Sequence, residues 1–217
     1  MSSAWILANG PLRVGRTPPP APDLVIAADG GARHAAALGV TVDYWIGDFD
    51  SARSGQLPQP VDPERRVLPT DKDLLDSEAA LGLAASLGAR RIVIWGGLGG
   101  RSDHALALLL VALRWRPRFS ELVLRSGREW ALPLLPGHLE LELAAGQVFS
   151  IVPMQDMEAV RLRGARWELD GEVLPWGSGR PHGNQAEGGV LILDFRAGSG
   201  ILIGQELGTS GKRVRVP

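Results

Sequence analysis

Two aspartates separated by a single residue are the side chains in this sequence best placed to act together. Asp48 and Asp50 lie in the segment Gly47-Asp48-Phe49-Asp50-Ser51, directly after the apolar run 43–46. In an extended chain, side chains at positions i and i+2 share one face, so the two carboxylates converge. Converging carboxylates repel unless a cation or proton lies between them, and Mg²⁺ takes oxygen ligands while leaving room for phosphates. On this segment alone, a solvated Asp-x-Asp turn is the simpler interpretation.

Other carboxylates strengthen the functional interpretation. Further aspartates occur at Asp29, Asp71, Asp73, Asp76 and Asp103. The pattern Thr70-x-x-Asp73 could be a capping box, and acidic residues near a helix start favour the helix dipole without any function. Helix capping explains one or two of these carboxylates and leaves the others unexplained. A cluster of so many carboxylates destabilises a fold unless cations are bound. Phosphates and a divalent metal at such a rim indicate a nucleotide-dependent phosphotransferase or a phosphohydrolase.

Three polar clusters each follow an apolar strand directly: 29–31, 47–51 and 96–104. In an open parallel sheet the ligand crevice lies beyond the carboxyl ends of the strands, so these clusters should face one cleft. Helix N-termini after the glycines of two clusters offer backbone N–H groups to phosphate. Neither cluster has the Walker or the dinucleotide-binding glycine spacing. Glycines are equally expected there because βα turns are tight.

The surrounding elements predict a parallel α/β domain. Continuous apolar runs, typical of strands covered on both faces, occupy 4–8, 24–28, 43–46, 91–95 and 121–124. Helical stretches are expected at 32–38, from residue 70 to about 87, and at 105–113. The last is apolar nearly all round, which predicts burial on most sides. Residues 52–69 are polar and hold four prolines, so we expect a loop there, with at most a short helix.

The pattern changes after about residue 126. Short strands separated by Gly and Pro are expected at 139–143, 148–152, 159–162, 190–195 and 200–203. Such spacing favours a β-sandwich or a similar antiparallel unit. The prediction is an N-terminal α/β domain at 1–127, followed by a C-terminal all-β sandwich domain at 128–217.

Composition excludes several classes of function. The formal net charge of −1 gives no basic field for nucleic acid, so no nucleic-acid partner is expected. The absence of cysteine excludes disulfides, thiolate catalysis and the usual structural zinc sites. No apolar run is long enough for a membrane span, so no membrane partner is expected. The first residues lack a basic signal-peptide region, and a cytoplasmic location is the expectation.

Four motifs in this order resemble thiamine pyrophosphokinase. They are Ala28-Asp29-Gly30-Gly31-Ala32, Gly47-Asp48-Phe49-Asp50-Ser51, Asp71-x-Asp73-x-x-Asp76, and Gly96-Gly97-x-x-Gly100-Arg101-x-Asp103-His104. The resemblance continues more loosely into the β-rich half, where Gly164-Ala165-Arg166-Trp167 and Gly183-Asn184 match the family's Gly-x-x-aromatic turn and Ser-Asn pair.

The resemblance implies a homodimer with interface active sites that transfers the diphosphate of ATP to the hydroxyl of thiamine and releases AMP. It implies Mg²⁺ ligands at Asp48, Asp50 and Asp76, with Asp71 and Asp73 close behind. The nucleotide and phosphate path would be lined by Asp29, Gly30, Gly31, Gly97, Arg101, Asp103 and His104. The thiamine site would hold Trp167, Gly183 and Asn184, with Trp167 contributed by the partner chain.

Two positions depart from the family pattern. Leu75 stands where the family usually has Thr, and Gly183 stands where it usually has Ser. Both losses remove a hydroxyl near the expected substrate. Two alternatives therefore stay open: a diphosphokinase for another heterocyclic alcohol, such as a hydroxymethylpterin, and a sensor that binds thiamine or nucleotide without catalysis.

Overall fold

The computed structural model describes residues 2–14, 20–48, 63–67 and 74–205. The chain divides into two compact units, Met1–Gly127 and Arg128–Pro217. The architecture is mixed α/β, with a large, mostly parallel sheet and an antiparallel sheet, as the sequence predicts. In the described part of the chain, no helix is long and apolar enough to cross a membrane.

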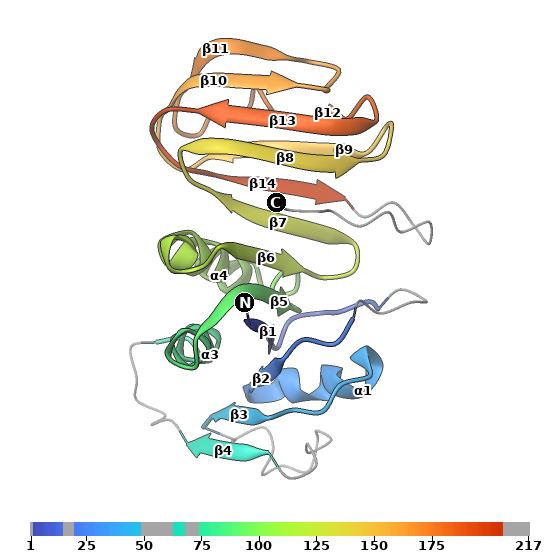
Figure 1. Cartoon of the computed structure of the whole chain (residues 1–217), viewed down its shortest axis with the longest axis vertical. Helices are drawn as coiled ribbons and strands as arrows, with labels where there is room; N and C mark the ends of the chain where they lie inside the picture. Colours follow the sequence, from blue (N-terminus) through green and yellow to red (C-terminus); the bar gives the residue numbers. More distant parts are fainter. Residues whose placement is uncertain (1, 15–19, 49–62, 68–73, 206–217) are drawn as a thin grey trace. The chain divides into compact units, whose positions relative to one another are not determined.

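The strands of the first unit form a parallel sheet (Figure 1). They are β1 (Ser2–Leu7), β2 (Leu24–Ala28), β3 (Tyr44–Gly47), β4 (Glu64–Val67), β5 (Ala89–Trp95) and β6 (Glu121–Arg125). Their order is β6-β5-β1-β2-β3-β4, and every pair of neighbours is parallel. The prediction of parallel strands from continuous apolar runs is thus confirmed for five strands. The sixth, β4, is a correction, because it lies in the segment expected to be a loop.

In the described part of the chain, helices follow β2, β4 and β5. They are η1 (Asp29–His34), α1 (Ala35–Leu38), α3 (Asp76–Ser86), α4 (Ser102–Trp115) and η2 (Arg116–Arg118). Gly39 ends α1 in the left-handed conformation, with φ of 68°, which only glycine adopts at little cost.

Two helix predictions were wrong. The helix expected from residue 70 begins at Asp76, although residues 70–73 lie outside the described part of the chain; Leu74 and Leu75 precede the helix, and Leu74 is half exposed. The expected burial of 105–113 on most sides is also wrong for the single chain. Only Leu108 and Ala112 of α4 are buried, whereas Leu106 and Leu110 are 54% and 43% exposed. A helix that is apolar all round does not reveal what covers it, and here the side chains of Leu106 and Leu110 are exposed to solvent.

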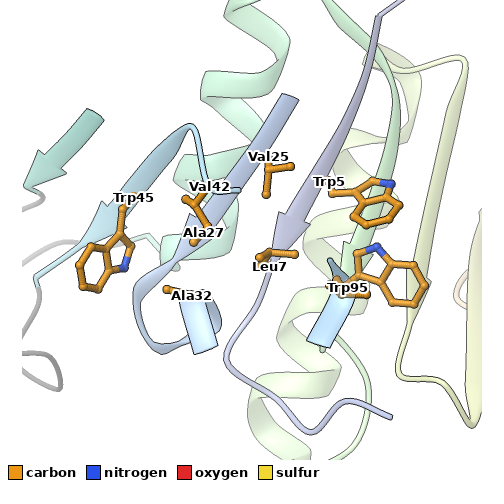
Figure 2. Packing of buried hydrophobic residues seen from close by; sticks show 9 residues of the cluster. Trp5, Leu7, Val25, Ala27, Ala32, Val42, Trp45 and Trp95 are labelled. Atoms are coloured by element: carbon orange, nitrogen blue, oxygen red, sulfur yellow. The ribbon is translucent and has the colours of Figure 1, made fainter. Parts of the chain in front are cut away.

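A buried apolar cluster holds β1, β2, β3 and β5 together (Figure 2). Trp45 projects from β3, and Trp5 and Trp95 project from the neighbouring strands β1 and β5. The rings of Trp5 and Trp95 meet edge to face, with centroids 5.4 Å apart. This contact adds about 0.5–1.5 kcal/mol to the burial of the two rings. The cluster therefore holds the strands that carry the polar segments in fixed positions relative to one another.

The second unit consists of antiparallel strands. They are β7 (Glu129–Leu134), β8 (Gly137–Leu143), β9 (Val148–Pro153), β10 (Met157–Arg163), β11 (Leu169–Leu174), β12 (Asn184–Gln185), β13 (Gly189–Phe195) and β14 (Gly200–Gln205). They pair in the orders β12-β9-β14-β7 and β11-β10-β13-β8. The five strands predicted here are confirmed. The sequence analysis missed β7, β11 and β12.

Candidate active site

The three predicted polar clusters lie at the ends of parallel strands. Asp29 follows β2, Asp48 follows β3, and residues 96–100 follow β5. Since these strands are parallel, all three clusters lie at the carboxyl edge of the sheet. This edge is where open α/β sheets bind their ligands.

Asp29 is held against the end of β3. A Cβ atom at Gly47 would lie 3.1 Å from Cα of Asp29, a close approach that glycine permits without any shift of the backbone. The indole Nε1–H of Trp45 donates a hydrogen bond of 2.9 Å to the backbone oxygen of Asp29. Asp29 has φ of 43°, a left-handed conformation that strains a residue with a side chain. Such strain persists where surrounding contacts determine the backbone, and it is frequent at functional sites.

The glycines at this edge have a packing role. A Cβ at Gly31 would lie 1.9 Å from the oxygen of Leu7, and one at Gly30 would lie 2.5 Å from Oδ1 of Asn9. At Gly97 a Cβ would lie 3.2 Å from side-chain atoms of Leu108. These contacts favour the alternative that the glycines serve close packing. The phosphate-binding role of Gly30, Gly31 and Gly97 stays a prediction.

The segment after β1 joins the same edge, and the sequence analysis missed its role. The guanidinium of Arg33 donates to the backbone oxygens of Asn9 (2.6 Å), Gly10 (3.1 Å) and Gly30 (3.1 Å). Nε2–H of His34 donates to the oxygen of Gly10 at 2.9 Å. Burial lowers the pKa of His34, so this ring stays neutral at neutral pH. One signal was available, since Asn9-Gly10 follows an apolar strand just as the other clusters do.

The first turn of α4 carries an exposed ion pair. The Arg101 guanidinium donates to both carboxylate oxygens of Asp103, at 2.6 and 3.2 Å, and the backbone N–H of His104 donates to the same carboxylate. The hydrogen bonds from Arg101 lower the pKa of Asp103 to about 2. Asp103 therefore stays ionised at all ordinary pH values, next to a cation that could contact phosphate.

The motif Asp71-x-Asp73-x-x-Asp76 lies only partly within the described residues. Asp76 is the first residue of α3, and Leu75 precedes it in an extended conformation at the N-cap position. Asp50, Asp71 and Asp73 lie outside the described residues, so their predicted roles stay predictions. Among the residues that are described, no three His, Cys, Asp or Glu side chains are grouped closely enough to hold a metal.

Glu78 was missed as a structural residue of this region. Its buried carboxylate accepts hydrogen bonds from the guanidinium of Arg114 and from Nε1 of Trp115, at 3.1 Å for the indole. It thereby ties the start of α3 to the end of α4. A groove of about 630 Å³ lies beside this contact, lined by Leu74, Leu75, Glu78, Ala107, Leu110, Val111 and Arg114.

Trp167 and Asn184 lie together in the second unit. Oδ1 of Asn184 accepts from the backbone N–H of Trp167 at 3.1 Å, and its Nδ2 donates to the oxygen of Trp167 at 2.8 Å. The Trp167 side chain is 52% exposed, and the guanidinium carbon of Arg166 lies 4.8 Å from the ring centroid. The Trp167 ring is therefore not part of the core of the single chain. Binding of thiamine by this ring stays a prediction.

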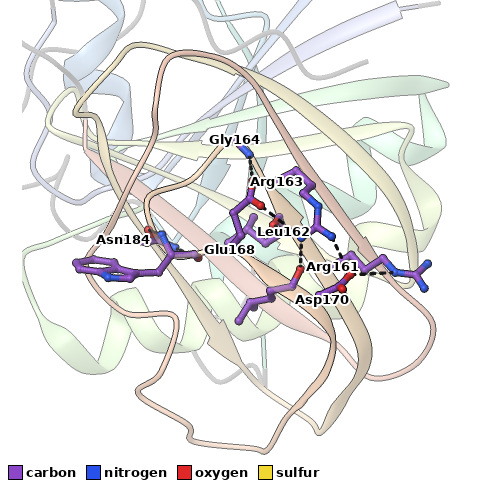
Figure 3. A network of polar contacts seen from close by, with 9 residues as sticks. Arg161, Leu162, Arg163, Gly164, Glu168, Asp170 and Asn184 are labelled. Atoms are coloured by element: carbon purple, nitrogen blue, oxygen red, sulfur yellow. Dashed lines mark hydrogen bonds and ion pairs between the residues drawn. The ribbon is translucent and has the colours of Figure 1, made fainter.

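A polar network holds the loop that carries Trp167 (Figure 3). At the end of β10, Arg163 donates to the oxygen of Leu169 at 2.8 Å and to the carboxylate of Asp170 at 2.7 Å. The N–H of Gly164 donates to Glu168 at 2.9 Å. Both ends of the loop are thus fixed, so the exposed indole projects from a rigid turn.

Gly183, next to Asn184, adopts a left-handed backbone conformation. Its φ is 68°, and a Cβ atom there would meet no other atom within 4 Å. The N–H of Gly183 donates to Oγ of Ser150 at 2.9 Å. A hydroxyl is therefore present at this place, although it comes from β9.

Comparison with known proteins gives a family match that covers most of the first unit. Residues 21–124 match the family model described as thiamin pyrophosphokinase, catalytic domain. The resemblance to thiamin pyrophosphokinase is confirmed. The matched segment contains every predicted aspartate, the Gly-Gly turn after β2 and the Arg101–His104 segment. The comparison with curated proteins gave no match.

Solved structures agree with the family at the level of the fold. Thiamine pyrophosphokinase from Bacillus subtilis superposes with a TM-score of 0.77 at 23% identity, covering 94% of this chain and 100% of that chain. The enzyme from Geobacillus thermodenitrificans gives 0.74 at 22% identity, with coverage of 94% and 98%. The yeast protein gives 0.68 at 15% identity, with coverage of 94% and 86%.

Proposed function

We propose that this protein is a thiamine diphosphokinase, which transfers the diphosphate of ATP to the hydroxyl of thiamine and releases AMP. The observation that carries the proposal is the family match over 21–124, because it contains the polar segments that end β2, β3 and β5. In this proposal the unit 1–127 binds nucleotide and metal. The unit 128–217 is a β-sandwich that binds thiamine and contributes to a homodimer.

The donor set suits Mg²⁺. The candidate ligands Asp48, Asp50 and Asp76 are all carboxylates, and Mg²⁺ prefers oxygen ligands in proteins. Mg²⁺ is usually held by one or two protein carboxylates together with phosphate oxygens and waters, so a closed cage of protein side chains is not required. When bound, the ion would neutralise charge on the transferred diphosphate.

The chain itself supplies position and charge to this reaction. Asp29, fixed against Gly47, would orient the nucleotide, and Arg101 would contact phosphate oxygens from the start of α4. The exposed Arg101–Asp103 pair could open for this contact at little cost, because solvent screens the attraction between the two charges. No protein nucleophile is required, because catalysis rests on in-line positioning and charge stabilisation.

Exposed apolar side chains support the homodimer. Leu106 and Leu110 lie on one face of α4, and Trp167 projects from a rigid turn of the second unit. Exposed clusters of large apolar groups usually mark interaction sites. Light scattering on the purified protein tests this part of the proposal, and a monomer at micromolar concentration would contradict it.

The decisive experiment is an AMP assay with Mg²⁺, ATP and thiamine. Asp48→Asn and Asp50→Asn should each nearly abolish AMP release while leaving the thermal unfolding temperature within a few degrees of the parent. Asp23→Asn is the matched control, because the Asp23 carboxylate accepts hydrogen bonds from the backbone N–H and the hydroxyl of Ser3 at the amino edge of the same sheet. Near-normal turnover in either aspartate variant would refute the metal assignment. A pterin alcohol accepted in place of thiamine would redirect the substrate assignment.

A further inference from the structure

Arg33 connects the loops that follow two neighbouring strands. One of its terminal nitrogens donates to the oxygen of Gly30 and to Oδ1 of Asn9, and the other donates to the oxygens of Asn9 and Gly10. All of these acceptors lie in the turns after β1 and β2. A planar guanidinium can satisfy several fixed acceptors at once, which a lysine ammonium cannot do with the same geometry.

The turn held by Arg33 is joined to a third strand end. The N–H of Gly10 donates to the oxygen of Gly96 at 3.0 Å, and the N–H of Ala8 donates to the oxygen of Trp95 at 2.7 Å. A Cβ at Gly10 would lie 2.3 Å from the oxygen of Gly96. Displacement of the turn after β1 would therefore disturb the turns after both β2 and β5.

Arg33 also acts on Asp29 electrostatically. Partial burial lowers the pKa of Arg33, and the negative charge of Asp29 opposes that shift, which means that the two charges interact. Asp29 occupies a strained backbone conformation directly beside the end of β3. In a rim rich in aspartates, a fixed cation reduces the repulsion that Asp29 adds.

We propose that Arg33 is a positioning residue for the nucleotide half of the active site. It holds the turns after β1 and β2 as one rigid body and offsets the charge of Asp29. Its donors are used on the protein's own carbonyl groups, so it acts through the backbone that it fixes. This inference rests on the proposed function for its kinetic readout, although its structural readout is independent of activity.

The test compares Arg33→Lys, which keeps the charge, with Arg33→Met, which keeps neither charge nor donors. Amide hydrogen exchange in peptides covering 8–14 and 29–34 should accelerate about tenfold or more in both variants, because local opening becomes easier. The KM for ATP should rise about tenfold, as expected for the loss of a charge-assisted contact, and more in the Met variant. The KM for thiamine should stay unchanged.

Arg116 provides the matched control. Arg116 lies in η2, before the amino end of β6; it is also partly buried, burial also lowers its pKa, and it donates to the backbone oxygen of Phe119. Arg116→Lys and Arg116→Met should change neither the exchange of 8–14 and 29–34 nor the KM for ATP. Equal effects of the Arg33 and Arg116 variants on unfolding temperature, with unchanged exchange and KM, would overturn the proposal.

Two further measurements keep the test decisive if a variant does not fold or if the protein forms no AMP. If Arg33→Met does not fold, Asn9→Ala removes a single acceptor and should still accelerate exchange at 29–34. If the parent protein forms no AMP, the proposed function has failed, and the inference is then judged by exchange together with titration of a non-hydrolysable ATP analogue. Unchanged exchange and unchanged analogue affinity in the Arg33 variants would overturn it in that case.

Discussion

Replacement of Trp167 by alanine is the most direct test of the thiamine half of the site. The thiazolium ring of thiamine carries a permanent positive charge, and an indole face attracts such a cation by about 0.5 kcal/mol when exposed and about 2 kcal/mol when desolvated. The side chain is 52% exposed in the single chain. An intermediate value corresponds to a rise in the KM for thiamine of about three- to tenfold, since 1.4 kcal/mol is a factor of ten.

Arg166 makes this prediction more specific. Its guanidinium carbon lies 4.8 Å from the centroid of the Trp167 ring, so a cation already covers one face. Thiamine would either displace Arg166 or bind the opposite face against its charge. Arg166→Ala should therefore lower the KM for thiamine, the opposite direction from Trp167→Ala, without affecting the KM for ATP.

Steady-state AMP release with varied thiamine or varied ATP measures both effects. Trp176→Ala is the matched control, because Trp176 is 73% exposed in the same unit and lies on another loop, where its N–H is held by Asp156. Trp167→Phe should retain part of the affinity, since a smaller aromatic face remains. An equal rise of KM in the Trp167 and Trp176 variants, or a loss of thermal stability with an unaltered KM, would refute the reasoning.

Three further predictions concern stability. The hydrogen bonds to Asp194 and Glu140 raise the pKa of His138, so their stabilising contribution is complete below about pH 6.5 and is lost as pH rises through the folded-state pKa. The unfolding temperatures of His138→Gln and of the parent, measured between pH 5.5 and 8.5, should therefore converge at high pH. A constant difference would contradict this. Leu75→Thr should raise the free energy of unfolding by about 1 kcal/mol in denaturant titrations, because it gives α3 an N-cap side chain; an unchanged or lower free energy of unfolding would contradict this. Gly183→Ser should lower that free energy by about 1–2 kcal/mol, because φ is 68°; an unchanged midpoint would show that the backbone relaxes.

Much of the first unit could be predicted because its signal is local. Apolar runs such as 24–28 are buried on both faces of a parallel sheet, so composition alone locates the strand. The strand β4 has the sequence Glu64-Arg65-Arg66-Val67 and lies at the edge of the sheet, where one neighbour suffices and apolar residues are not required. Its pairing with β3 is a property of the fold that no local pattern records.

The candidate site, too, could be predicted only in part. Aspartates after strands were predictable, because parallel topology brings strand ends to one edge. The connections among them were not, because Arg33 and His34 bind backbone oxygens of Asn9 and Gly10, more than twenty residues away. Backbone acceptors are the same at every position, so the sequence carries no mark of which residue will use them.

The two departures from the family pattern do not by themselves indicate lost catalysis. Leu75 occupies the N-cap of α3, where a threonine hydroxyl would serve the helix as readily as a substrate. Gly183 adopts a left-handed backbone and donates its N–H to the hydroxyl of Ser150, so the place of the family's serine is still next to a hydroxyl group. Asn184, the partner in that pair, is buried and bound to Trp167 at both ends of its amide. At Gly183 the hydroxyl thus comes from Ser150 instead, whereas the change to Leu75 removes a hydroxyl without replacing it. Neither change removes the aromatic turn or an acidic strand end, the features that the proposed diphosphate transfer to thiamine would use.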